Sequence, residues 1–251
     1  GRKSAGNPFY IEEWIASLKR KLSSGESIDL YDFAIPENVL ELVLSRLMHL
    51  DKQSIILLQK ASAIGLNFYK SVLQKLDDKL APKSDIELNM QHISAVEFLY
   101  TLSENEEDTE YGFRHSITHQ AVYDSILKIN KKLMHKIIAE IIEAQYQQAL
   151  PQWFFALEHH YAEAEEQGKR LYYLRESIDF ARSVFMNKKT IEYCDKLLAL
   201  ENLAKREEIV TLKATVLLDM GLYAEATELL AQLGKVYNSD EYVLAQTRIL
   251  M

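Results

Sequence analysis

Two histidines, His115 and His119, have the spacing of a metal site. They lie in the stretch FRHSITHQAVYDSIL, which has a helical pattern, and imidazoles four residues apart on a helix can share a metal ion. A zinc protease needs a glutamate directly after the first histidine as general base, whereas this chain has Ser116. A structural zinc site needs two further ligands, and the chain has a single cysteine, Cys194. We therefore expect no bound metal, and packing of both side chains on an apolar helix face.

The other motifs also give little support to catalysis. His159 and His160 are adjacent and so point to different faces of a helix, which disfavours joint chelation. The stretch GRKSAGN has the glycine spacing of a phosphate-binding loop, but Asn7 and Pro8 stand where lysine and serine or threonine should follow. No Ser-His-Asp or Cys-His arrangement stands out. We expect that this chain is not an enzyme by itself.

Composition narrows the class of protein. A chain of 251 residues can hold one large or two ordinary domains, and 48% apolar with 26% charged residues is typical of a folded protein. A formal charge of −8 makes nucleic acid an unlikely partner, because phosphate binding needs a basic surface. One cysteine, no apolar run of membrane-spanning length and no signal-peptide pattern indicate a cytoplasmic protein without a membrane partner.

The elements that would position these residues are mostly helical. Apolar spacings of three and four dominate, and only 8 glycines and 4 prolines interrupt them. Helix starts are predicted at Asn7–Pro8, at Pro36 and after Asp51, with the third helix ending at Gly65. After Gly65, Phe68, Val72, Leu73 and Leu76 form another amphipathic face. A change from helix to strand is predicted near Phe98, and the loop SENEEDTE separates two short β-prone stretches. Three helices followed by a hairpin form the outline of a winged helix.

The second half has the pattern of paired helices. Helical periodicity runs from His115 to Tyr146 with a break near Ile129 and Asn130, and Pro151 begins a new series of helices. In LKATVLLDMGLYAEATELL, small, turn and aromatic residues fall at the positions of a tetratricopeptide unit: Ala214, Gly221, Tyr223 and Ala226. Thr190 precedes Ala226 by 36 residues, close to the period of 34. The predicted fold is mainly α, a winged-helix-like domain with a small β-hairpin followed by an α-solenoid of tetratricopeptide-like (TPR-like) helix pairs.

The order of these motifs resembles one family. GNPFYIEE, IPENVLELVLSRLMHLD, LLQKASAIG, YGFRHSITHQAVYDSIL and LMHKIIAEIIE, followed by helical repeats, are similar to the part of a STAND-type signalling ATPase that follows its nucleotide-binding core. That family includes MalT-like activators, the ATPase region of soluble-type nucleotide cyclases, and NOD proteins. The resemblance implies a lid-helix remnant at 1–35, a winged-helix-like domain at 36–128, linking helices at 129–166 and truncated TPR-like repeats at 167–251.

The resemblance also implies two nucleotide-binding residues. In the family, the lid begins with a Gly-x-Pro motif whose proline approaches adenine, and Gly6-Asn7-Pro8 is similar to it. The winged helix of the family ends with a histidine, often in Met-His-Asp, that reaches the β-phosphate of ADP. FRHSI aligns with this motif at His115, with Arg114 in place of Met and Ser116 in place of Asp. Pro8 and His115 are thus candidate cofactor-binding residues for ATP or ADP in the parent protein, although this fragment would hold no cofactor itself. The alternative is that His115 is a packed or hydrogen-bonded structural residue.

The function implied is regulatory. The chain would couple the nucleotide state of an upstream domain of the same chain to a protein or small-molecule ligand sensed by the TPR-like repeats. The alternative is a transcriptional regulator whose winged helix binds DNA directly. The candidate wing, ENEEDTE, is acidic and would repel the DNA backbone, so the regulatory reading is preferred.

Overall fold

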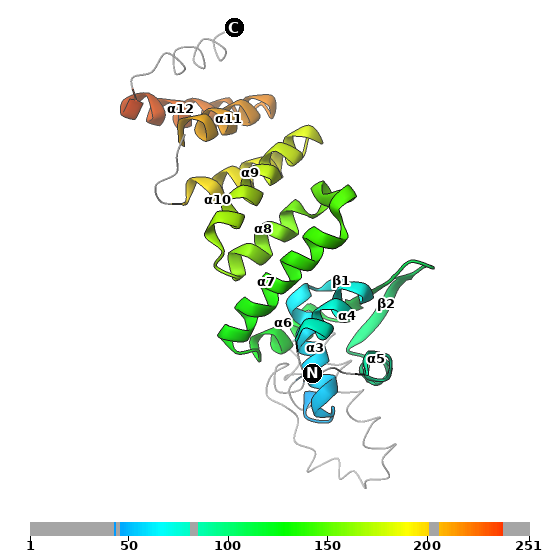
Figure 1. The fold of residues 1–251 in the computed structure, drawn as a ribbon. Helices are drawn as coiled ribbons and strands as arrows, with labels where there is room; N and C mark the ends of the chain where they lie inside the picture. The colour runs from blue at the N-terminus through cyan, green and yellow to red at the C-terminus, as the bar shows by residue number, and fades with distance from the viewer. Residues whose placement is uncertain (1–42, 44–45, 81–84, 201–205, 238–251) are drawn as a thin grey trace, which may run out of the picture. The chain divides into compact units, whose positions relative to one another are not determined.

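The computed structural model describes residue 43 and residues 46–80, 85–200 and 206–237. Expectations for the first 42 residues, including the helix predicted at Asn7–Pro8 and the role of Pro8, lie outside this part of the chain. The described residues are mainly helical and include one small antiparallel sheet, as Figure 1 shows. The chain divides into two compact units, residues 1–137 and 138–251, which are described separately.

Side-chain caps set the helix starts of the first unit. Helix α3 (Lys52–Ile64) begins at Asp51, whose carboxylate accepts hydrogen bonds from the backbone N–H groups of Gln53 and Ser54. It ends at Gly65, so both predicted boundaries are confirmed. Helix α5 (Ile86–Ala95) begins in the same way at Asp85. These caps satisfy N–H groups that have no partner within the helix.

Three strands form the sheet of the first unit. The strands are β1 (Asn67–Tyr69), β2 (Leu99–Glu104) and β3 (Thr109–Phe113), in the antiparallel order β1-β3-β2. The hairpin of β2 and β3 and the change from helix to strand near Phe98 were both predicted, and both are confirmed. Strand β1 was not predicted, because three residues are too few to show an alternating pattern.

The core of the first unit lies between these helices and the sheet. Helix α4 (Lys70–Lys79) directly follows β1 and places Leu73 next to α3. Leu57, Leu58, Leu73, Ile93 and Phe98 are each at most 1% exposed. Burying a side chain of this kind contributes about 1.5–3 kcal/mol of transfer free energy. These side chains hold the strands and the three helices in one hydrophobic cluster.

The helical segment after the sheet breaks earlier than predicted. Helix α6 (Ser116–Asp124) ends before Ser125, whose hydroxyl donates to the carbonyl oxygen of Val122. Helix α7 (Lys128–Gln145) then contains both Ile129 and Asn130, where the break was expected. That placement was wrong because serine, which competes for backbone carbonyls, ends the first helix locally.

The second unit is a succession of helices. A short 3₁₀ segment, η1 (Gln147–Trp153), contains Pro151 and leads into α8. Consecutive helices then pack on one another, with short turns between most of them: α8 (Phe154–Glu163), α9 (Gln167–Ser183), α10 (Asn187–Leu198), α11 (Arg206–Asp219) and α12 (Tyr223–Tyr237). Figure 1 shows α9 with α10, and α11 with α12, as antiparallel pairs.

The turns of the two helix pairs have the same backbone geometry. Phe185 lies between α9 and α10 with φ 58°, and Gly221 lies between α11 and α12 with φ 76°. After Phe185, the N–H of Met186 donates to the carbonyl of Ala181 at 2.8 Å. After Gly221, the N–H of Leu222 donates to the carbonyl of Leu217 at 2.9 Å. Both turns therefore end the first helix of the pair with a Schellman motif.

The spacing of these turns agrees with the repeat found in the sequence. Phe185 and Gly221 are 36 residues apart, as are Thr190 and Ala226. Thr190 and Ala226 are both 0% exposed and lie in the second helix of each pair. The 36-residue offset is therefore present in the backbone and in the core.

Candidate functional site

His115 occupies the junction of β3 and α6. It is the N-cap residue of α6 in an extended conformation, with φ −138° and ψ 135°, and its side chain makes no capping hydrogen bond. Its carbonyl oxygen accepts from the N–H groups of Thr118 and His119, each at 3.1 Å. Just before it, the N–H of Arg114 donates to the carbonyl of Phe98 at 3.0 Å. The backbone of His115 is thus fixed on both sides, while its side chain is partly exposed.

His119 lies one turn later in a different environment. Its Nε2 is 2.9 Å from the carbonyl oxygen of Ser62. Its ring meets Phe113 edge-on at 5.0 Å and stacks on Tyr123 at 6.3 Å, measured between centroids. Burial lowers the pKa of His119, and the hydrogen bond to Ser62 opposes that effect. The prediction that His119 is a packed, structural residue is confirmed.

The acidic hairpin loop is partly structural. The carboxylate of Asp108 accepts from the backbone N–H of Ser71 at 3.1 Å and from its hydroxyl at 2.5 Å, so it caps the first turn of α4. The side-chain oxygen of Asn105 accepts from the N–H groups of Glu107 and Asp108, which fixes the loop. Glu106 and Glu107 are exposed. The loop therefore presents carboxylates where a DNA-binding wing presents cations.

Sequence reasoning missed one buried ionic group. Asp77 lies among the charged residues of α4, and its sequence neighbours give no sign that it is buried. The structure instead buries it to 2% exposure, with its carboxylate 2.7 Å from the ammonium of Lys60, which is buried to the same degree. Lys60 lies on α3, and no local pattern relates two charges 17 residues apart. The pair therefore removes Asp77 from the exposed face of α4.

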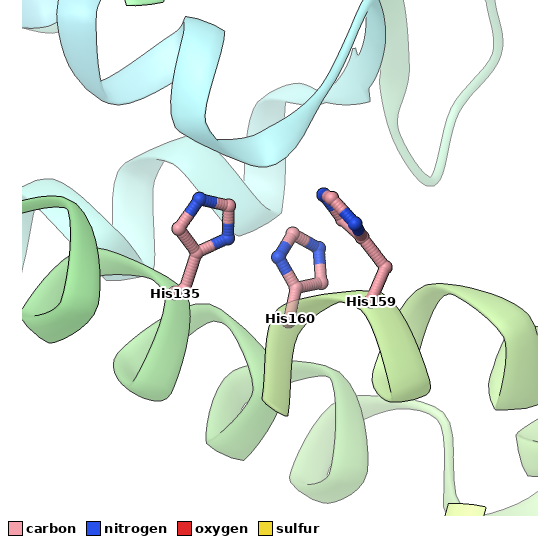
Figure 2. Close-up of side chains that lie close together, drawn as sticks. All are labelled: His135, His159 and His160. Atoms are coloured by element: carbon pink, nitrogen blue, oxygen red, sulfur yellow. The ribbon is translucent and has the colours of Figure 1, made fainter. Parts of the chain in front are cut away.

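Three further histidines are possible metal ligands by residue type, and Figure 2 draws them as sticks: His135, His159 and His160. His135 belongs to the first unit, and its Nε2 is 2.8 Å from the hydroxyl of Tyr123. His159 and His160 belong to the second unit and are neighbours on α8, with ring centroids 5.4 Å apart. A site made from all three would depend on the relative placement of the two units, which the structure does not determine, so we assign none.

Comparison with known proteins gives no relative. No protein-family model and no curated protein sequence matches the chain. None of the helices in the described part of the chain is both long enough and apolar enough to cross a membrane.

Proposed function

We propose that this chain is the regulatory and interaction part of a STAND-type signalling ATPase, in which nucleotide state is coupled to the sensing of a partner. The order of elements in the first unit supports the proposal. Helices α3, α4 and α5 precede the β2–β3 hairpin, which is the order of a winged helix. The His115 motif follows directly after the second hairpin strand.

The position of His115 is the observation that carries the proposal. A histidine that senses a phosphate needs a fixed backbone and a side chain that a nucleotide can approach. His115 combines the two, whereas the ring of His119 is held against Ser62, Phe113 and Tyr123. An imidazole that donates to the β-phosphate of ADP stabilises the closed state relative to the open one, and such a difference can bias a switch.

The helix pairs of the second unit would provide the sensing surface. The 36-residue offset between equivalent turns and core residues of the two pairs is what a TPR-like array requires, because each unit can then pack on the next in the same way. The turn itself is not specific to the pairs, since the same Schellman motif also ends α5 at Glu97 and α8 at Glu165. Such arrays bind proteins or small ligands along their surface.

The test is ADP release from the full-length protein. His115→Ala should accelerate ADP release at least about tenfold, equivalent to about 1.4 kcal/mol of lost stabilisation. His92→Ala is the matched control, because His92 is an exposed histidine of the same unit and should leave release unchanged. A folded His115→Ala protein with the release rate of the unchanged protein would leave His115 as a structural residue and remove the main support for the proposal.

Direct DNA binding is the competing function. The winged-helix order of elements favours it, but the exposed carboxylates of Glu106 and Glu107 oppose it, and Lys70 on α4 is already 2.6 Å from Glu87. We expect no binding of duplex DNA above background at low salt. Tight binding that weakens steeply with salt would favour a transcriptional regulator.

A further inference from the structure

An open groove runs along the second unit between the second helices of the two pairs. It has a volume of about 370 Å³ and is lined by residues of α10, α11 and α12. Its lining follows α12 from Leu222, the residue before the helix, to Gln232. Ten residues of helix span about 15 Å. The groove is therefore long enough for about three turns of a second helix.

The inner surface of the groove is apolar. Ile191 comes from α10, Leu217 from α11, and Leu222 and Leu229 from the α12 side. Leu217 is 3% exposed and forms the buried base, whereas Ile191 and Leu229 are partly exposed and Leu222, at the edge, is 36% exposed. Such a surface gains free energy by removing an apolar side chain of a ligand from water.

The edge of the groove is acidic. Asp195, Glu225 and Glu228 line it, and the only cation among its lining residues is Lys213. The ammonium of Lys213 lies 2.5 Å from the carboxylate of Asp195, so these two charges offset each other. Glu225 and Glu228 are exposed, and within the described part of the chain neither side chain has a hydrogen bond or ion pair. Two adjacent carboxylates on one turn of α12 are thus left to attract cations.

We propose that this groove binds a short amphipathic helix of a partner protein, with an apolar stripe flanked by lysine or arginine. The stripe would cover Ile191, Leu222 and Leu229, and the flanking cations would reach Glu225 and Glu228. Helix-in-groove binding combines these two kinds of contact. The proposal deepens, and rests on, the interaction role given above to the helix pairs.

The test is fluorescence anisotropy with a labelled 14-residue helical peptide that carries a leucine stripe flanked by lysines. We expect saturable binding that the double substitution E225K/E228K weakens at least about tenfold, or about 1.4 kcal/mol. The matched control is E106K/E107K, which makes the same change of charge in the exposed hairpin loop of the first unit and should stay within about twofold. A peptide with glutamate in place of every lysine should bind at least about tenfold more weakly.

Leu222→Ser tests the apolar part independently. Leu222 is at the edge of the groove, so this change should weaken binding about tenfold while leaving the circular dichroism spectrum unchanged. Unchanged affinity in E225K/E228K, or equal losses in the groove and control variants, would overturn the proposal, because net charge alone would then explain binding. Failure here leaves the ADP-release test of His115 unaffected, and an unchanged ADP release would leave groove binding standing, so the two ideas fail separately.

Discussion

The ammonium nitrogen of Lys60 lies 2.7 Å from a carboxylate oxygen of Asp77, and both side chains are 2% exposed. The same ammonium donates to the carbonyl of Leu80 at 2.9 Å. This pair joins α3 to α4 inside the first unit. Burying a charge costs free energy unless an opposite charge lies beside it. The helices α3 and α4 must therefore pack so that the Lys60 ammonium and the Asp77 carboxylate stay in contact.

Asp77→Ala should lower the free energy of unfolding by about 3–5 kcal/mol in urea denaturation, because it leaves the Lys60 ammonium buried without its counter-charge. The double change Lys60→Met with Asp77→Leu should cost less than Asp77→Ala alone, since no charge remains buried. Lys70→Ala is the control, because its pair with Glu87 lies at the surface, with the two side chains 29% and 66% exposed, and its loss should cost below about 1 kcal/mol. A similar loss for Asp77→Ala and Lys70→Ala would contradict this account.

Cys194 should be unreactive in the folded chain. The side chain is 0% exposed within the cluster of Leu174, Ile178 and Leu197, and burial together with the charge of Asp195 raises the pKa of its thiol to about 12. Because the thiolate is the reactive form, labelling with a thiol reagent at pH 8 should be at least about a hundredfold slower in buffer than in denaturant. Fast stoichiometric labelling of the native chain would show that the α9–α10 core opens readily.

The Schellman turns at Phe185 and Gly221 predict opposite effects of opposite substitutions. Phe185 has φ 58° and a side chain that is 87% exposed, so Phe185→Gly should stabilise the second unit by about 1 kcal/mol. Gly221 has φ 76° and open space around the position of an added Cβ, so Gly221→Ala should destabilise by about 1 kcal/mol through backbone strain alone. Gly168→Ala, on α9 with similar open space, should instead stabilise by about 0.5–1 kcal/mol. Thermal unfolding of the three variants checks the signs, and a stabilising Gly221→Ala would rule out the strain argument.

His119 should make stability depend on pH. Burial lowers its pKa in the folded state below the ordinary value of 6.5, so on acidification the unfolded chain takes up this proton first. The stabilising contribution is therefore complete above pH 6.5 and is lost as pH falls below that value. Urea denaturation between pH 7.5 and 5 should show a smaller loss of stability in His119→Gln, which keeps an N–H for the Ser62 carbonyl and does not titrate. Parallel curves for the unchanged chain and His119→Gln would disprove the assignment.

Local features of the fold could be predicted from the sequence, and features made by distant residues could not. Residues close in sequence determine three of the predicted features: the cap at Asp51, the helix end at Gly65 and the hairpin. Local sequence patterns therefore predicted them correctly. Strand β1 exists because Phe68 lies opposite Tyr111 of β3, more than forty residues later. Lys60 and Asp77 likewise meet only after α3 and α4 pack.

Of the two histidines of the candidate site, only His119 could be placed from the local sequence pattern. Periodicity placed His119 on an apolar face, and its contacts with Phe113 and Tyr123 agree with that placement. The proposed nucleotide role of His115 rests on a family resemblance rather than on periodicity. Its backbone is fixed by hydrogen bonds and its side chain is partly exposed, which is compatible with that role.

The recurring turn also bears on how such a chain could evolve. Each turn takes its hydrogen bonds from residues at most five positions away, at Ala181 and Met186 in one pair and at Leu217 and Leu222 in the other. Duplication or loss of a whole helix pair would therefore leave the turns of the remaining pairs intact. The number of copies, and with it the extent of recognition surface, could change between descendants without the redesign of a shared central core.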